Sequence, residues 1–307
     1  MRRAIFLFLD GVGFGSDDPK SNPLVAGRYP TLSRLAQGKP LTAATGRIHS
    51  EIADIVPLDA CMGVEGRPQS ATGQATLLTG KNVPLAIGEH YGPRPDDRIR
   101  AQLDASNLFK QLREQGLLAN FVNAYPPRFH ASVKRGKRLL SSIQYAVTSA
   151  GLPLHDESDL TSGAALSVEY TNASWRDHLG YQNAPVYQPA EAGRQLWRIA
   201  QPCSFIMHDN WLTDELGHHQ DMEGAIRNFT LFDGVLGGLL DVIDLSETLI
   251  VVASDHGNVE DCSHGKHTLN PAFCMVIGNR QGLPVEQMRS LCDVAPLIRQ
   301  FLMMSSV

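Results

Sequence analysis

Short apolar runs that stop abruptly on polar residues recur along this chain of 307 residues. The clearest run covers residues 249–253 and is followed at once by Ser254, Asp255 and His256. A run this short and this apolar predicts a strand buried on both faces, as in a parallel sheet. Further runs of this kind lie at residues 4–9, 203–207 and 273–277.

Segments with helical spacing of apolar positions lie between these runs, at residues 30–36, 69–80, 141–150, 192–200, 222–242 and 294–303. Thr31 or Ser33 is expected to cap the first helix, and Gly80 stands where a glycine ends the second. Strands that alternate with helices predict an α/β fold, with a mostly parallel sheet sandwiched by helices.

The texture of the sequence changes between residues 85 and 189, where prolines are frequent and apolar periodicity is weak. An apolar run at residues 117–122 indicates that this segment is folded and is not a linker. We therefore expect a core built from residues 1–84 and 190–307, with residues 85–189 inserted as a smaller α/β cap domain that binds the substrate.

Composition narrows the function classes. The formal net charge of −5 gives no electrostatic basis for binding nucleic acid, and no apolar run is long enough to span a membrane. The five cysteines are odd in number and form no CxxC pair, which suits a reducing cytoplasm better than a disulfide framework. We expect a cytoplasmic protein with no membrane partner, and the sequence leaves its oligomeric state open.

Polar residues with metal-binding chemistry follow several of the predicted strands. Asp10 ends the first run, Asp255 and His256 end the run at 249–253, and Asp214 and His218 are spaced by one helical turn. Asp and His are good ligands for transition metals, and ligands in open α/β sheets bind beyond the carboxyl ends of the strands. The alternative is that these side chains are helix caps, core partners or surface groups.

Two other segments have competing interpretations. The glycines after Asp10 suggest a dinucleotide fingerprint, but Ser16 stands where its third glycine is required and no clear helix follows at once. Ser70, at the start of a predicted helix, is either an N-cap or a nucleophile, and taken alone the N-cap is the commoner role.

Five motifs in the same order resemble those of the alkaline phosphatase superfamily, in the branch of cofactor-independent phosphoglycerate mutase and phosphopentomutase. The resemblance covers residues 1–84 and 190–307 and does not extend clearly over the cap. The motifs are Asp10-Gly11-Val12-Gly13, Ser70-Ala71-Thr72-Gly73-Gln74, Asp214-Glu215-Leu216-Gly217-His218, Asp255-His256-Gly257-Asn258 and His267-Thr268.

This resemblance implies two divalent metal ions. One site would use Asp214, His218 and His267, and the other would use Asp10, Asp255, His256 and the oxygen of Ser70. Three imidazoles favour zinc or manganese over magnesium, and two ions about 3.5–4 Å apart clamp a phosphoryl group during in-line displacement. Ser70 would be the catalytic nucleophile, and His219 and His264 are expected to support the ligands or to face solvent.

Several features depart from the family pattern or leave a choice open. Gln74 replaces the histidine that the mutases have after the glycine of the nucleophile segment, and Thr72 is an alternative nucleophile two residues from Ser70. A sulfatase is disfavoured because the segment after Cys61 lacks the Pro or Ala and the Arg of that motif. The family's substrate-binding arginines have no clear counterparts in the cap. A basic stretch there supplies the candidate substrate-binding residues Arg128, Lys134, Arg135 and Lys137.

The sequence thus predicts phosphoryl transfer from a small phosphorylated metabolite through a phosphoserine intermediate. A small cap that admits water favours a phosphatase, and a phosphomutase is the alternative within the same family. A metal-stabilised binding protein without turnover is the alternative from another class, and the unbroken set of ligands argues against it.

Overall fold

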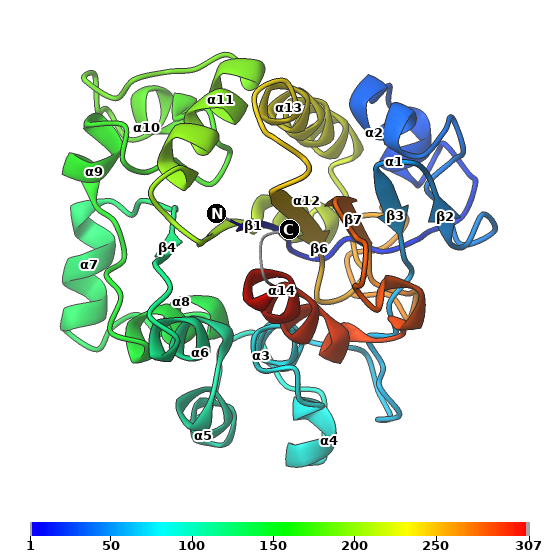
Figure 1. Cartoon of the computed structure of the whole chain (residues 1–307), viewed down its shortest axis with the longest axis horizontal. Helices are drawn as coiled ribbons and strands as arrows, with labels where there is room; N and C mark the ends of the chain where they lie inside the picture. The colour runs from blue at the N-terminus through cyan, green and yellow to red at the C-terminus, as the bar shows by residue number, and fades with distance from the viewer. Residues whose placement is uncertain (1, 305–307) are drawn as a thin grey trace.

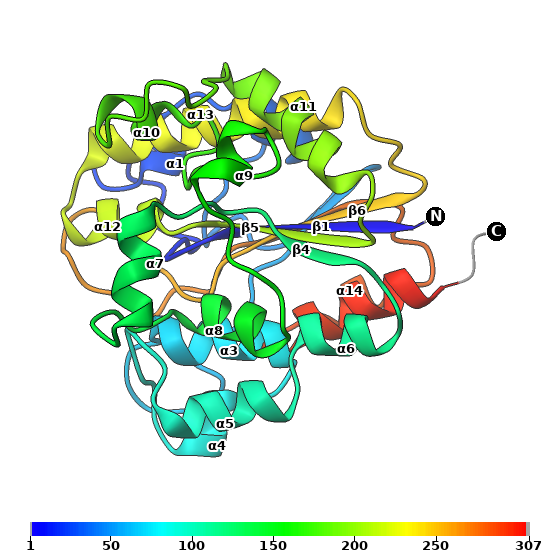
Figure 2. The same cartoon turned by 90° about the vertical axis from the view of Figure 1, so that its left-hand side faces the viewer.

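The computed structural model describes residues 2–304, which form one seven-stranded sheet with helices on both faces (Figures 1 and 2). The strand order across the sheet is β2-β3-β7-β6-β1-β5-β4. The strands are β1 (Arg3–Leu9), β2 (Ile48–His49), β3 (Ala53–Ile55), β4 (Ala119–Phe121), β5 (Phe205–Asn210), β6 (Thr248–Ala253) and β7 (Cys274–Gly278).

The central strands are parallel, as the sequence predicts. β1 pairs in parallel with β5 and β6, and β4 continues this part of the sheet beside β5. The other edge is antiparallel, because β7 runs opposite to β6, β3 opposite to β7, and β2 opposite to β3. The α/β class is therefore confirmed, and the sheet is mixed and mostly parallel.

Helices cover the sheet in two layers. In Figure 2 helices α11 and α13 lie above the sheet, and α3, α6, α8 and α14 lie below it. The structure contains α1 (Pro23–Ala26), α2 (Pro30–Leu35), α3 (Ser70–Thr79), α4 (Val83–Ile87), α5 (Asp97–Ala105), α6 (Leu108–Glu114), α7 (Pro127–Lys134), α8 (Ser142–Ser149), α9 (Glu157–Thr161), α10 (Ala173–Asp177), α11 (Pro189–Ala200), α12 (Leu212–His218), α13 (Met222–Leu240), α14 (Val294–Met303) and the 3₁₀ turns η1 (Val285–Gln287) and η2 (Leu291–Asp293).

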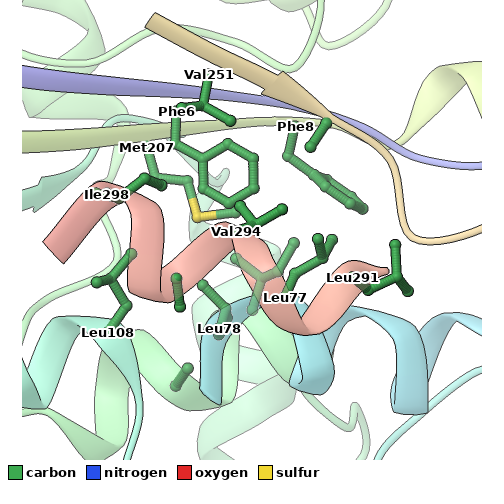
Figure 3. Packing of buried hydrophobic residues seen from close by; sticks show 14 of the residues in the cluster. Phe6, Phe8, Leu77, Leu78, Leu108, Met207, Val251, Leu291, Val294 and Ile298 are labelled. Atoms are coloured by element: carbon green, nitrogen blue, oxygen red, sulfur yellow. The ribbon is translucent and has the colours of Figure 1, made fainter. Parts of the chain in front are cut away.

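Alternation along the strands supplies both layers of the core. Phe6 and Phe8 of β1 face the layer of α3 and α14, while Ile5 and Leu7 face the layer of α13. Figure 3 shows the first of these clusters, in which Phe6 and Phe8 lie near Leu77, Leu78, Val294 and Ile298. A strand buried on both faces has no polar side, which explains its continuous apolar run.

Two helix ends test the expected capping. Gly80 ends α3 in the left-handed conformation with φ of 70°, as predicted from its position. The predicted cap of α2 is wrong, because neither Thr31 nor Ser33 precedes the helix. The buried carboxylate of Asp233 instead accepts hydrogen bonds from the backbone N–H groups of Thr31 and Leu32. A long-range partner of this kind leaves no local signal in the sequence.

Residues 85–189 are connected to the main sheet. Their strand β4 pairs with β5, and α5, α6 and α8 pack in the layer that contains α3. The apolar run predicted at 117–122 is thus the edge of the central sheet. The division into a core and an inserted cap stays a prediction.

No helix in the described part of the chain is long and apolar enough to cross a membrane.

Replacing Leu78 with Ala should reduce the free energy of unfolding by about 2–5 kcal/mol, because this fully buried side chain lies between α3 and α14 and its loss leaves a cavity. Urea unfolding measures the change. Leu85→Ala is the matched control, since Leu85 is 62% exposed, and its effect should stay below about 0.5 kcal/mol. Equal losses in the two variants would contradict the packing described here.

Candidate metal centre

The candidate site lies where β1, β5 and β6 end. Leu9 of β1 pairs with Asn210 of β5, and Phe8 pairs with Ala253 of β6, so the three carboxyl ends are level. Asp10 and Asp255 follow these ends, and α12, which starts shortly after β5, carries Asp214 and His218. The parallel sheet therefore brings together residues that are far apart in the sequence.

Two groups of side chains have donor atoms close enough to hold a metal ion. Asp10, Asp255 and His256 form one group, and Asp214, His256 and His267 form the other. Within each group the donor atoms lie within 4.8 Å of one another. His256 belongs to both groups, whereas the sequence assigns it to one site.

His218 also lies at this centre, as its spacing from Asp214 predicts. Its Nε2 atom is 3.2 Å from Asp214 Oδ2 and 3.2 Å from His267 Nε2. All seven predicted metal ligands are therefore brought together: Asp10, Ser70, Asp214, His218, Asp255, His256 and His267. Their function as ligands stays a prediction.

Two of the imidazoles are oriented by backbone carbonyl groups. His218 Nδ1 is 3.0 Å from the carbonyl oxygen of Gly265, and His267 Nδ1 is 2.7 Å from that of Pro68. An Nδ1–H that donates to a carbonyl leaves Nε2 as a free lone pair. When both rings are neutral, the two Nε2 lone pairs face each other over 3.2 Å, and a proton on His218 or a cation beside them removes this repulsion.

The carboxylates of this centre repel one another. Burial, then the charges of Asp255 and Asp214, raise the pKa of Asp10 well above its usual value. Burial, then Asp214, raise the pKa of Asp255 to about 7. Asp10 Oδ1 and Asp255 Oδ2 are buried without a hydrogen-bond partner. Such oxygens, together with free imidazole nitrogens, fit divalent cations well.

The pKa values of Asp214 and His218 are shifted in the directions that favour their charged forms. Burial would raise the pKa of Asp214, but the hydrogen bond with His218 and the nearby His256 and His267 outweigh burial and lower it. The same hydrogen bond raises the pKa of His218 to about 9. Burial lowers the pKa of His267 to about 4, so this imidazole is neutral and available as a ligand at neutral pH.

Amide side chains hold two of the carboxylates. Gln74 Nε2 donates to Asp10 Oδ2 over 3.2 Å, and Asn258 Nδ2 donates to Asp214 Oδ1 over 2.7 Å. Gln74 is the residue that departs from the family pattern, and here it contacts a proposed ligand. Gly73 has a spatial role, since a Cβ atom there would lie 2.8 Å from the Cβ atom of Asp255.

Ser70 is the first residue of α3, and Gln69 occupies the cap position. The Ser70 hydroxyl lies 3.1 Å from His256 Nε2 and lines the cavity in front of the centre. The Thr72 hydroxyl instead donates to the carbonyl oxygen of Gln69 over 3.0 Å and is fully buried. The N-terminus of α3 adds a partial positive charge beside Ser70.

A cavity of about 1170 Å³ opens in front of the centre, and Asp10, Ser70, Asp214 and His218 are among the residues that line it. Arg94, Arg128 and Arg138 also line it. Of the four cap residues predicted to bind substrate, Arg128 is therefore at the cavity. Lys134, Arg135 and Lys137 are exposed and are not among the residues that line it.

Arg94 and Arg138 were not among the expected substrate-binding residues. Burial, then the neighbouring charge of Arg138, lower the pKa of Arg94, and Asp209 and Asp10 oppose this shift. Arg94 therefore shares the cavity with acidic residues of the candidate centre. The sequence shows a basic cluster around Arg94. Only the folded structure shows that Arg94 lines the cavity, whereas Arg98 forms ion pairs with Glu89 and Asp96.

Asp209 is a further residue that sequence patterns did not indicate. It lies within β5, is buried at the cavity, and its Oδ1 atom has no hydrogen-bond partner. Burial, then the charge of Asp255, raise its pKa to about 7. His219 and His264 belong to neither ligand group, and their expected supporting or solvent-facing role stays a prediction.

Comparison with known proteins gives the class of this chain. Residues 195–306 match the sequence family described as the metalloenzyme superfamily. Structures with the same overall fold include the PH0037 protein from Pyrococcus horikoshii, at 14% identity and a TM-score of 0.58 over 100% of this chain and 98% of that one. Alkaline phosphatase from the Antarctic bacterium TAB5 aligns at 14% identity and a TM-score of 0.54, over 99% of both chains.

Residues 195–306 thus match the metalloenzyme superfamily, and the chain as a whole has an alkaline phosphatase-like fold. It is distantly homologous to cofactor-independent phosphoglycerate mutases. The 2,3-bisphosphoglycerate-independent phosphoglycerate mutase 2 of Methanosarcina barkeri is 31% identical over 98 residues, which are 29% of this chain and 18% of that protein. The mutase of Ehrlichia canis is 30% identical over 109 residues, 33% of this chain and 22% of that protein.

These matches cover about a fifth of the length of the curated relatives. The family expected from the motifs, and with it an enzyme of this superfamily, is confirmed. Which reaction this chain catalyses is a separate question.

The protein should bind two Mn²⁺ ions per chain and release at least one proton on binding at pH 7. His218 has a pKa of about 9 in the metal-free protein, and a ligating nitrogen must be unprotonated, so affinity should rise with pH up to about 9. Elemental analysis and titration calorimetry in buffers of different ionisation enthalpy measure both quantities.

Histidine variants give the control for this measurement. His267→Ala should lower the metal content, and His219→Ala, which alters an exposed neighbour of His218, should not. Fewer than about one equivalent in the well-folded wild-type protein would contradict a two-metal centre.

Proposed function

We propose that this protein transfers a phosphoryl group from a small phosphomonoester to Ser70, and that water then hydrolyses the phosphoserine. One observation carries this proposal. Ser70 Oγ lies 3.1 Å from Nε2 of His256, the residue that belongs to both candidate ligand groups, and Ser70 lines the cavity. The match of residues 195–306 to the metalloenzyme superfamily supports a metal-dependent phosphoryl-transfer reaction.

The residues that would hold the metals are Asp214, His218 and His267 for one ion, and Asp10, Asp255 and His256, with Ser70, for the other. When bound, two divalent ions supply Lewis-acid polarisation of the phosphoryl oxygens and lower the pKa of the Ser70 hydroxyl. The imidazole-rich donor set favours zinc or manganese.

The chain's own groups would do the rest of the work. Ser70 Oγ would lose its proton to solvent and form the new bond to phosphorus, while the bond to the leaving oxygen of the substrate breaks and that oxygen takes up a proton from solvent. The N-terminus of α3, where Ser70 stands, would add a partial positive charge beside the phosphoryl group. Attack of water on phosphorus then releases inorganic phosphate and restores the Ser70 hydroxyl.

Arginines of the cavity are the proposed binding groups for the anionic substrate. Arg94 is half-buried, it lines the cavity together with Arg138, and the charge of Arg138 contributes to lowering its pKa after burial. A phosphate dianion compensates the repulsion of such a pair and accepts bidentate hydrogen bonds. Arg128, one of the four substrate-binding residues expected from the sequence, lines the same cavity and is the third proposed binding group.

Hydrolysis is favoured over mutase transfer because the cavity in front of Ser70 is wide and open to water. The curated relatives are mutases, which keeps phosphoryl transfer to a second hydroxyl as the second candidate. The two reactions share every step up to the phosphoserine. A metal-stabilised binding protein would not need a serine hydroxyl facing both ligand groups.

Replacing Ser70 with Ala should abolish turnover of p-nitrophenyl phosphate in the presence of Mn²⁺, because no phosphoserine can form. Thr72→Ala should retain most activity and lose about 1 kcal/mol of stability through its hydrogen bond to Gln69. Steady-state kinetics and thermal unfolding separate these effects. An inactive Thr72 variant beside an active Ser70 variant would reverse the assignment of the nucleophile.

Replacing Arg94 with Ala should lower kcat/KM for a phosphomonoester by about 10–100-fold, since a charge-assisted hydrogen bond to phosphate contributes about 1.5–3 kcal/mol. Metal content should stay at the wild-type value. Arg98→Ala is the matched control, because Arg98 is an exposed arginine of the same segment with ion pairs outside the cavity. Equal losses in the two variants would remove Arg94 from the binding site.

A further inference from the structure

Glu260 is a fully buried carboxylate behind the metal centre, with 0% of its surface exposed. It belongs to neither of the two candidate ligand groups. Its two oxygens accept four hydrogen bonds from neutral donors. A carboxylate buried to this degree is costly unless all its lone pairs are used, and here they are.

The four donors come from two connections, the loop after β1 and the long connection between β6 and β7 that carries Glu260 itself. Oε2 accepts from the backbone N–H of Gly13 over 2.9 Å and from that of Asn258 over 2.7 Å. Oε1 accepts from the hydroxyl of Thr268 over 2.5 Å and from the side-chain amide of Asn270 over 3.0 Å. One side chain therefore ties together the loops that follow β1 and β6 and the segment before β7.

Each of these loops carries proposed metal ligands. Gly13 is three residues after Asp10, Asn258 is two residues after His256, and Thr268 directly follows His267. A shift of any loop relative to Glu260 would move a ligand out of the reach that a metal ion tolerates, since coordination distances vary by only a few tenths of an ångström.

The same carboxylate accounts for glycines in two of the motifs. A Cβ atom on Gly13 would lie 2.7 Å from Glu260 Oε1, and one on Gly257 would come still closer to that oxygen. Both loops therefore need glycine in order to approach Glu260.

We propose that Glu260 is a positioning residue that holds the loops of Asp10, Asp255–His256 and His267 in the arrangement that binds the metal ions. It acts through these ligands and touches neither substrate nor metal. This inference rests on the proposed metal centre. The alternative is that Glu260 stabilises the fold without any specific effect on metal affinity.

The test uses Glu260→Gln in the full chain, with Mn²⁺ as the probe. The amide keeps the size of the side chain but puts N–H groups against N–H and O–H donors. We expect the dissociation constant of Mn²⁺ to rise about 10–100-fold, as for other residues that orient metal ligands. With saturating Mn²⁺, kcat should return close to the wild-type value, because the loops are then held by the metals.

Asp233→Asn is the matched control. Asp233 is also a buried carboxylate that accepts two backbone N–H groups, those of Thr31 and Leu32, but it stabilises α2 and contacts no ligand loop. This variant should lower Tm and leave the dissociation constant of Mn²⁺ unchanged. The rise in Tm on adding Mn²⁺ should shrink in Glu260→Gln and stay at the wild-type size in Asp233→Asn.

Thr268→Val supplies a milder second variant if Glu260→Gln fails to fold. It removes one of the four donors and keeps the shape, so a several-fold weaker affinity for Mn²⁺ is expected. Wild-type affinity in a folded Glu260→Gln or Thr268→Val variant, or an equal loss in Asp233→Asn, would overturn the role of Glu260. A wild-type protein that binds no Mn²⁺ would instead contradict the proposed function.

Discussion

Repulsion between buried carboxylates is the constraint on which the functional end of this molecule depends. Asp10, Asp209 and Asp255 lie at or near the ends of adjacent strands, and burial, then the charge of a neighbouring carboxylate, raises the pKa of each. A cluster of this kind destabilises the fold unless protons or cations neutralise it. The imidazole nitrogens beside it favour metal cations over protons. The stability of the fold and the proposed chemistry therefore both require bound metal cations.

The parallel sheet explains why the carboxylates meet. The β1 strand lies between β5 and β6, and matched register brings their carboxyl ends to one edge. The apolar layers on both faces fix these strands, and the loops beyond them are free to carry polar residues. Backbone carbonyl groups of Pro68 and Gly265 orient two of the imidazoles, so the backbone fixes the direction of these donor groups.

Much of this arrangement could be predicted from the sequence. The apolar runs predict β1 and β6, and the order of the polar motifs predicts the family and the residues that meet at the centre. Local patterns could not predict the cap of α2, because its partner Asp233 is about two hundred residues away. The same limit applies to Asp209 and Arg94, whose importance comes from neighbours that only folding supplies. It also applies to Lys134, Arg135 and Lys137, since charge density along the chain does not tell which side of α7 and its C-terminal turn faces the cavity.

The most direct test of the account is to trap the covalent intermediate. The protein would be mixed with Mn²⁺ and p-nitrophenyl phosphate, quenched in acid, digested, and analysed by peptide mass spectrometry. The account predicts one phosphoryl group on Ser70 that appears during turnover and disappears once the substrate is exhausted. Steady turnover without phosphorylation of Ser70, or with the phosphoryl group on Thr72, would contradict it.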